Sequence, residues 1–256
     1  MKIYFTSGWG KAVLSVQNIW DMHCHVIPGV DDGAASLEIS LRMLHTMYKD
    51  GVRSVILTPH FRQGMFETPR DVVQGSFERL ERAVDTVMPQ MQLFLGCEFH
   101  DNPVMTQFLD RDGRYRMNGT GYVLLEFSGG DSARHIRERC HELIRAGYTP
   151  IVAHVERYAA LHTDRKLAGD LKDLGACLQV NANSVLGLDG WKQKMFCLRA
   201  LEKGFVDFIG SDAHNMKDRR PHIGECAEFV SRKFGEKTAR RIFIANPSKV
   251  ADNCEL

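Results

Sequence analysis

The sequence predicts an α/β protein whose parallel strands close into a barrel. Short apolar runs alternate along the chain with segments in which apolar residues recur every three or four positions, the period of an amphipathic helix. Strands that alternate with helices form parallel sheets, because each helix carries the chain back to the start of the next strand. About seven such units in a chain of 256 residues favour a closed barrel over an open sheet.

The expected strands are short and apolar, and they span residues 19–25, 54–60, 92–99, 122–128, 150–156, 177–184 and 206–214. The expected helices have helical spacing of their apolar residues and span 35–49, 70–88, 102–110, 132–147, 163–175, 189–204 and 222–244. No composition break or long linker divides the chain. We therefore expect one domain over residues 19–256, preceded by an arm at 1–18 whose role the sequence does not indicate.

The composition argues against a nucleic-acid or membrane partner. The 33 basic and 32 acidic side chains are well mixed and leave a formal net charge of +1, so no basic track is present. No apolar run approaches the roughly 18 residues needed to span a bilayer. The 7 cysteines form no C-x-x-C pair, which suits reduced thiols in a cytoplasmic protein. The sequence does not indicate an oligomeric state.

The first expected strand ends in a pair of histidines. Side chains alternate between the faces of a strand, so His23 and His25 point the same way and Cys24 points back into the core. Two imidazoles on one face are suited to bind one metal ion, and the acidic loop that follows, with Asp31 and Asp32, offers an oxygen ligand. One of these aspartates is expected to be that ligand and the other to cap the next helix.

The other expected strands also end in polar residues. In a β/α barrel the carboxyl ends of the strands converge on one face, where the chemistry takes place. Six of the seven ends carry ionisable groups: His23 and His25, His60, Glu98, Glu126, His154 with Glu156 and Arg157, and Asp212 with His214. The sixth strand offers Asn181 and Asn183 instead, for which hydrogen bonding to backbone groups at the barrel mouth is a sufficient role.

This set of side chains is too large for one metal ion. The imidazoles and carboxylates would supply two or three divalent ions, and a mixed N/O set suits Mn, Fe or Zn. Adjacent metal ions activate water for hydrolysis. Arg157 and the pair Arg219-Arg220 offer guanidinium groups that match phosphate in a bidentate manner, although each of them could equally be a surface residue. The residues alone thus predict a phosphomonoester hydrolase.

Simpler interpretations exist for parts of this set. His60 follows Thr58-Pro59 and could be bonded only to backbone. Cys226 and Arg232 have the C-x5-R spacing of cysteine phosphatases, but no glycine lies between them to expose backbone N–H groups to phosphate. We attribute that spacing to chance.

Several motifs resemble one known family. They are Asp-Met-His-Cys-His with Pro-Gly-Val-Asp-Asp-Gly (21–33), Thr-Pro-His (58–60), Gly-Met-Phe-Glu-Thr-Pro (64–69), Leu-Glu-Phe-Ser (125–128), Ile-Val-Ala-His-Val-Glu-Arg-Tyr (151–158), Gln-Val-Asn-Ala-Asn-Ser (179–184) and Ser-Asp-Ala-His-Asn (211–215). Over residues 19–247 the chain resembles the bacterial manganese-dependent tyrosine-protein phosphatases of capsular and exopolysaccharide synthesis, within the polymerase-and-histidinol-phosphatase (PHP) superfamily.

The resemblance implies a distorted (β/α)7 TIM-like barrel with a three-metal centre. On matching positions, the first metal would be bound by His23, His25, Glu98 and Asp212, the second by the shared Glu98 with Glu126 and His154, and the third by Asp32, His60 and His214. Arg157 and Arg219 would bind phosphate. Arg220 is a second candidate for phosphate binding and ranks behind Arg219, because the family usually shows only a single arginine before prolines at this point.

The resemblance also implies the substrate, phosphotyrosine on a membrane-associated bacterial tyrosine kinase that controls polysaccharide export. The alternative is a small-molecule phosphatase of the same fold, such as a histidinol phosphatase. A binding protein without turnover should lack metal ligands, and none is missing. A metal amidohydrolase often uses a strand-end lysine, and none occurs. In the loop 61–69, Phe66 could stack on an aryl phosphate or simply plug the barrel mouth.

Overall fold

The computed structural model describes residues 16–256 and has parallel α/β architecture. The predicted arm at 1–18 lies, up to residue 15, outside the described residues. The strands are β1 (Ile19–Cys24), β2 (Val52–Leu57), β3 (His60–Phe61), β4 (Gln92–Leu95), β5 (Glu98–His100), β6 (Tyr122–Glu126), β7 (Thr149–Val152), β8 (Cys177–Asn181) and β9 (Phe208–Gly210). They form a three-stranded sheet in the order β1-β2-β4 and a six-stranded sheet in the order β3-β5-β6-β7-β8-β9. Every pair of neighbouring strands is parallel, which confirms the predicted class.

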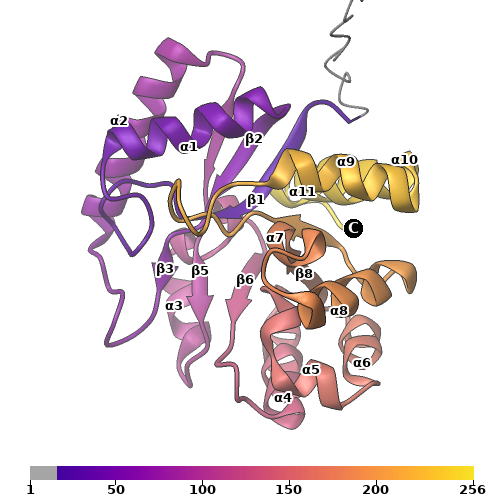
Figure 1. Ribbon diagram of the computed structural model, residues 1–256. Coiled ribbons are helices and arrows are strands. Elements are labelled where there is room, and N and C mark those ends of the chain that lie inside the picture. Colours follow the sequence, from indigo (N-terminus) through magenta and orange to yellow (C-terminus); the bar gives the residue numbers. More distant parts are fainter. Residues whose placement is uncertain (1–15) are drawn as a thin grey trace, which may run out of the picture.

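Helices follow nearly every strand. The α-helices are α1 (Leu37–Lys49), α2 (Arg70–Val87), α3 (Met105–Arg111), α4 (Ala133–Arg145), α5 (Ala159–Thr163), α6 (Leu167–Leu174), α7 (Ala182–Leu186), α8 (Trp191–Glu202), α9 (Ile223–Phe234), α10 (Glu236–Arg240) and α11 (Asn246–Ala251). Short 3-10 turns η1 (Gly113–Tyr115), η2 (Met117–Gly119) and η3 (Val155–Arg157) and a π-helical turn η4 (Arg241–Ala245) complete the described elements. Helices α1 and α2 lie at the end of the molecule opposite α4, α5 and α6 (Figure 1).

Two of the predicted strands are each divided into two. The run 54–60 forms β2 and β3 on either side of Thr58-Pro59, where proline has no N–H to donate to a ladder. The run 92–99 forms β4 and β5, separated by Gly96-Cys97. These breaks separate the two sheets: β2 and β4 pair with each other, and so do β3 and β5.

Other boundaries also differ from the prediction, and the strand expected at 206–214 is limited to Phe208–Gly210. The strand expected at 150–156 ends at Val152, and Glu156 lies in η3; the strand expected at 177–184 ends at Asn181, where α7 begins. The single helix expected at 222–244 is interrupted at Gly235, which separates α9 from α10. The aspartate expected to cap α1 does not do so, because the cap is Ser36, whose side chain accepts a hydrogen bond from the Ile39 N–H.

The first and last strands meet at their carboxyl ends. Cys24 and Ala213 form a parallel bridge, the Asp212 N–H donates to the His23 carbonyl at 2.8 Å, and the His25 N–H donates to the Ala213 carbonyl at 2.9 Å. The larger apolar core lies between strands and helices and includes Cys24, as predicted, whereas a smaller one gathers Met22, Ile56, Leu124, Ile151 and Phe208. The strand ends that carry the polar residues are therefore brought together.

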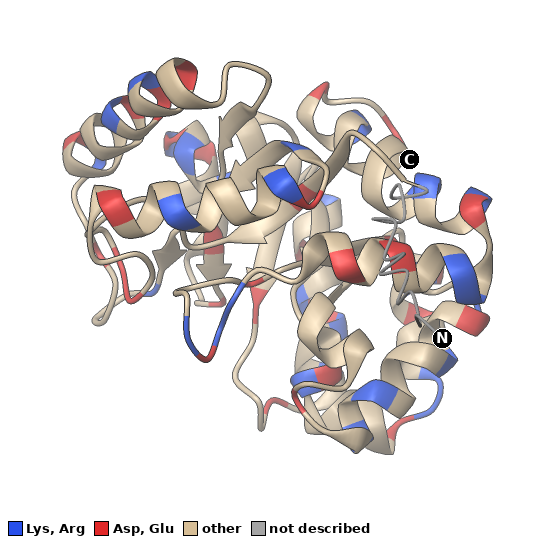
Figure 2. Ribbon diagram, turned by 45° about the horizontal axis from the view of Figure 1, so that its top comes forward, with Lys and Arg blue, Asp and Glu red and all other residues tan. Residues whose placement is uncertain are grey.

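The described surface mixes both signs of charge. Figure 2 shows basic and acidic segments interspersed along the helices, as the near-neutral composition requires. Within the described part of the chain, no helix has both the length and the apolarity needed to cross a bilayer.

Candidate metal centre

All nine predicted metal ligands lie in one largely buried cluster at the carboxyl ends of the strands. The donor atoms of eight of them fall into three overlapping groups, and within each group every donor atom lies within 4.8 Å of the others. The groups are His23, His25, Glu98 and Asp212; His25, Asp32, His60 and His214; and His60, Glu98 and Glu126. His154 is the one predicted ligand outside these groups, and it contacts Glu98 directly.

The first group, which we call the inner group, is almost completely buried. His23 and Glu98 are 0% exposed, and His25 and Asp212 are nearly so. Asp212 Oδ1 lies 3.7 Å from His23 Nε2 and 3.5 Å from His25 Nε2. Two imidazoles and two carboxylates thus surround one point, which is a common ligand set for a divalent ion.

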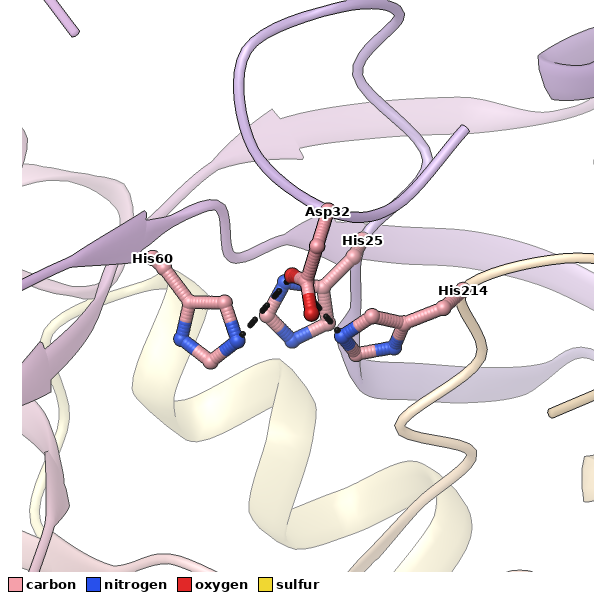
Figure 3. Close-up of side chains that lie close together, drawn as sticks. All are labelled: His25, Asp32, His60 and His214. Atoms are coloured by element: carbon pink, nitrogen blue, oxygen red, sulfur yellow. Dashed lines mark ion pairs between the residues drawn. The ribbon is translucent and has the colours of Figure 1, made fainter. Parts of the chain in front are cut away.

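The second group, the outer group, surrounds the carboxylate of Asp32. Asp32 Oδ1 lies 3.5 Å from His60 Nε2 and 3.5 Å from His214 Nε2, and Figure 3 shows the carboxylate between these two rings with His25 behind it. The Asp32 side chain is 50% exposed, whereas that of His60 is 12% exposed. The outer group therefore lies on the solvent side of the inner one.

Glu98 joins the groups. Four imidazole nitrogens lie close to its carboxylate: His23 Nε2 at 3.3 Å, His25 Nε2 at 3.2 Å, His60 Nδ1 at 3.0 Å and His154 Nε2 at 2.7 Å. Glu126, at the end of the neighbouring β6, also lies near His154, with its Oε1 3.7 Å from His154 Nε2. Glu98 is in a position to bridge two ions.

The outward-facing nitrogens of four histidines are held by neighbouring groups. A metal-binding histidine is oriented by the partner of its other ring nitrogen. These Nδ1 partners are Asp31 Oδ2 for His25 at 2.8 Å, Gln179 Oε1 for His23 at 3.3 Å, the Tyr158 hydroxyl for His154 at 3.3 Å and the Asp212 carbonyl for His214 at 3.0 Å. All four histidines therefore present Nε2 to the cluster.

The orienting side chains Asp31, Gln179 and Tyr158 were not identified as functional from the sequence. Each lies within a resembling motif, and Asp31 stands beside the predicted ligand Asp32. Gln179 also accepts a hydrogen bond from the His154 N–H at 2.7 Å, so it contacts two ligands. Only the distance between Gln179 and His23 in the fold reveals this role, because 156 positions separate them in the sequence.

Two glycines allow the backbone to approach the ligands. A Cβ atom on Gly33 would lie 2.1 Å from the His25 carbonyl oxygen, and one on Gly210 would lie 2.5 Å from His23 Cβ. Both distances are too short for any larger residue without movement of the backbone. The acidic loop and β9 can pack against the end of β1 because these positions are glycine.

The backbone is strained at two of the ligands. His154 has φ +30° and Asp212 has φ +50°, in the left-handed region that non-glycine residues rarely adopt. His154 immediately precedes η3, so the turn directs its ring inward while Arg157 follows three residues later. The strain lies at the functional residues.

The carboxyl groups of the cluster differ in pKa. Burial alone would raise the pKa of Glu98 and Asp212, but the surrounding histidines hold both well below their usual values, with Arg157 and Arg219 adding to the effect on Asp212. Burial raises the pKa of Glu126 to about 7, and the charge of Glu98 adds to this shift. Glu98 and Asp212 are therefore carboxylates at neutral pH, whereas Glu126 is half protonated.

The histidines divide in a similar way. Burial lowers the pKa of His25, but Asp31, Asp212 and Glu98 outweigh it and hold this pKa well above the usual value. Burial and the charge of His25 lower the pKa of His214 to about 4, while the hydrogen bond with His214 lowers the pKa of Asp32 to about 2. The donors that His214 and Asp32 contribute are already deprotonated at neutral pH.

The donor set fits divalent metal ions. Glu98 Oε2 and His214 Nε2 are buried and make no hydrogen bond of good geometry; their near neighbours are other donor atoms of the cluster, into which both point. The Nε2 atoms of His23 and His25 lie 3.3 Å apart, so at most one of them carries a proton. Buried polar atoms without partners are costly, and a cation at these points would satisfy them.

Two of the three predicted arginines reach the cluster. Arg157 donates to Asp212 Oδ2 at 2.9 Å and Arg219 donates to Asp212 Oδ1 at 2.7 Å. Their side chains stay 40% and 35% exposed, so both remain accessible to a ligand. Arg220 is exposed and its charge acts on Asp50, at the end of α1, so the structure does not bring it to the cluster.

A parallel α/β fold with a cluster of His, Asp and Glu side chains at the carboxyl ends of its strands is the arrangement of a metallohydrolase. The profile of the family described as "Capsular polysaccharide synthesis, CpsB/CapC" matches residues 19–252. The chain belongs to this family, which confirms the family predicted from the motifs.

Curated relatives cover nearly the whole chain. The tyrosine-protein phosphatase CpsB of Streptococcus pneumoniae is 33% identical over 235 residues, which are 90% of this chain and 97% of the relative. The tyrosine-protein phosphatase YwqE of Bacillus subtilis is 29% identical over 236 residues, 92% of this chain and 90% of the relative.

Solved structures also match the fold of this chain. A structure reported for YwqE from B. subtilis and CpsB from S. pneumoniae, described as unique metal-dependent tyrosine phosphatases, matches with a TM-score of 0.85 and 28% identity, covering 92% of this chain and 95% of its own. The histidinol phosphate phosphatase from Lactococcus lactis matches with a TM-score of 0.58 and 15% identity, covering 87% and 94%, so this likeness shows the fold alone.

Proposed function

We propose that this protein is a metal-dependent protein-tyrosine phosphatase. One observation carries the proposal: a buried cluster of metal-binding side chains ends, on its open side, in Arg157 and Arg219, both directed at Asp212. The cluster suits hydrolysis and the two guanidinium groups suit a phosphate ester. The relatives that cover nearly the whole chain are named tyrosine-protein phosphatases, which favours phosphotyrosine over a small phosphate ester.

The cofactor would be two or three divalent ions, with Mn preferred and Fe or Zn as alternatives. The inner group would bind one ion, Asp32, His60 and His214 a second, and Glu98 with Glu126 and His154 a third. Such ions, when bound, supply Lewis-acid chemistry and lower the pKa of water. The mixed nitrogen and oxygen donors support this choice without selecting among the metals.

The arginines would bind and orient the phosphate group. Arg157 and Arg219 each use one guanidinium nitrogen on Asp212, and their remaining N–H groups are available to phosphoryl oxygens. Asp212 also accepts a hydrogen bond from the Asn181 side chain at 2.8 Å, so its orientation is fixed from a third direction. Asp212 thereby links the position of the phosphate to that of the inner group.

Several finer points belong to this proposal. The nine strands occupy seven positions around the site if β2 with β3 and β4 with β5 each count once, which supports a distorted (β/α)7 barrel. The substrate would be a phosphotyrosine protein, with a membrane-associated tyrosine kinase as the candidate. A cytoplasmic location, the domain division at residue 19 and a contribution of Arg220 stay predictions.

The experiment compares two substrates on the metal-loaded protein. Metal-depleted protein is reloaded with Mn, Fe or Zn, and kcat/KM is measured on a phosphotyrosine peptide and on L-histidinol phosphate. We expect a higher kcat/KM on the peptide, and activity that depends on the added metal. A preference for histidinol phosphate would replace the proposal by the small-molecule alternative, and full activity after complete chelation would refute the metal mechanism.

A further inference from the structure

His60 differs from the other four histidines of the cluster in how its ring is held. In His23, His25, His154 and His214 a group behind the ring bonds the second nitrogen. In His60 both ring nitrogens face carboxylates of the cluster, with Nδ1 3.0 Å from Glu98 Oε2 and Nε2 3.5 Å from Asp32 Oδ1. No described residue supplies His60 with an outer hydrogen-bond partner.

The face of the His60 ring is held instead. The Phe66 ring stacks on it with the ring centroids 5.0 Å apart and the planes only 14° from parallel. The His25 ring also contacts the His60 ring, at a centroid distance of 4.3 Å and an angle of 39°. The His60 imidazole thus contacts both an aromatic ring and another predicted ligand, and its separation from Phe66 is typical of favourable ring stacking.

Phe66 is itself fixed by a small hairpin. Arg62 and Phe66 exchange backbone hydrogen bonds of 3.0 and 2.8 Å, and Gly64 makes the turn between them with φ +77°. Two residues after Phe66, the Thr68 hydroxyl donates to the Val30 carbonyl at 2.6 Å, which ties the hairpin to the acidic loop. The hairpin therefore presents Phe66 at a defined place.

The backbone of His60 is fixed independently of Phe66. Its N–H donates to Asp31 Oδ2 at 3.0 Å, and His60 pairs with Glu98 in the parallel ladder of β3 and β5. What these contacts leave open is the rotation of the ring about its bond to Cβ. A ring that rotates would withdraw Nε2 from Asp32, and the outer group would lose one of its donors.

We propose that Phe66 is a positioning residue of the outer group: it holds the His60 imidazole in the orientation that binds a metal ion. The inference rests on the proposed metal centre and assigns a function to the loop 61–69. It differs from a plug, whose loss would lower stability alone, and from a stacking surface for the aryl group of the substrate, whose loss would change KM alone.

The test uses three full-length variants and a readout of bound metal. Phe66→Leu keeps most of the apolar volume but removes the ring, whereas Phe66→Tyr keeps the ring. Met65→Ala is the control, because Met65 directly precedes Phe66 and is 62% exposed. Metal-depleted proteins are titrated with Mn, and bound Mn per chain is measured by elemental analysis after gel filtration.

We expect Phe66→Leu to raise the Mn concentration needed for full loading by about tenfold, the lower end of the effect of removing a ligand's orienting partner. Phe66→Tyr and Met65→Ala should load like the unaltered protein. Unchanged Mn loading in Phe66→Leu would overturn the proposal, in favour of the plug if the melting temperature falls, or of substrate stacking if KM for an aryl phosphate rises at saturating Mn.

Two further outcomes would also decide whether the stacked Phe66 ring is responsible for Mn loading. Loss of loading in Met65→Ala, or no recovery in Phe66→Tyr, would show that the hairpin as a whole matters rather than the stacked ring, and would overturn the proposal. If the unaltered protein retains no Mn, the proposed metal centre fails together with this inference, whereas normal loading of all variants refutes the inference alone.

Discussion

The inner and outer groups share His25 but are built in different ways. The inner ligands His23 and Asp212 lie where the backbones of the first and last strands bond to each other, and both are buried. The outer group depends on Asp32, which is half exposed, and on His60, whose ring is held by stacking. The inner group is buried and the rings of both its histidines have outer hydrogen-bond partners, whereas the outer group includes a half-exposed carboxylate and one ring without such a partner among the described residues. The two groups should therefore differ in affinity and in tolerance to change.

The largest expected effect comes from Glu98, because it contacts both groups. Replacing it, in Glu98→Gln, removes a bridging charge from among four imidazoles, and the loss of several kcal/mol of stabilisation corresponds to about 10³-fold in kcat/KM. Elemental analysis should show loss of metal from both groups. A variant that keeps full metal content and activity would remove Glu98 from the centre, and circular dichroism serves as the folding control.

A smaller effect is expected when only the outer group is changed. Asp32→Asn leaves every inner ligand in place but removes the carboxylate between His60 and His214. We expect the Mn concentration for half-maximal activity to rise about 10- to 100-fold, with activity recovered at high Mn. Activity versus Mn concentration measures this, and an irreversible loss as deep as that of Glu98→Gln would abolish the distinction between the groups.

The smallest expected effect is a difference between the inner and outer groups in the number of protons released when a metal ion binds. His25 has a raised pKa, so in the metal-free protein it is protonated at pH 7 and must lose a proton when Nε2 binds an ion. Inner-group affinity should therefore rise as pH rises, by about tenfold per unit below that pKa. His214 and Asp32, with pKa values of about 4 and about 2, are deprotonated already and release none above about pH 5.

Calorimetric titration with Mn in buffers of different ionisation enthalpy counts these protons. About one proton should be released for the first ion bound at pH 7, and the same number should be found in Asp32→Asn. If Asp32→Asn releases no proton when the first ion binds, the proton comes from the outer group. That result would contradict its assignment to His25 of the inner group.

The sequence was sufficient for the class of fold and for predicting which side chains the fold brings together in one cluster. His23 and His25 are recognisable because strand periodicity places them on one face, and Glu98, Glu126, His154 and Asp212 because each ends an apolar run. The convergence of these ends follows from parallel topology alone. The ligand assignments therefore depended on local patterns that the sequence displays.

The residues that orient the ligands could not be predicted in this way. Gln179 and Tyr158 are a strand residue and a loop residue with no distinctive spacing, and their roles depend on which ring nitrogen the fold brings beside them. The position of Arg220 also depends on tertiary packing, whereas the break of the second strand at Thr58-Pro59 has a local cause, the proline without an N–H. Ser36 was missed as the helix cap because Asp31 and Asp32, also good caps, stand just before it.

The left-handed backbone at His154 and Asp212 has a consequence for the evolution of heat resistance. Each such conformation costs roughly 1–2 kcal/mol in a residue with a side chain, a cost that glycine avoids. Glycine at either position would relieve this strain, but it would also remove the Asp212 contacts with Arg157 and Arg219 or the His154 contact with Glu98. The strained backbone and the side chains of the proposed metal centre are therefore inherited together, and heat resistance has to be gained at other positions.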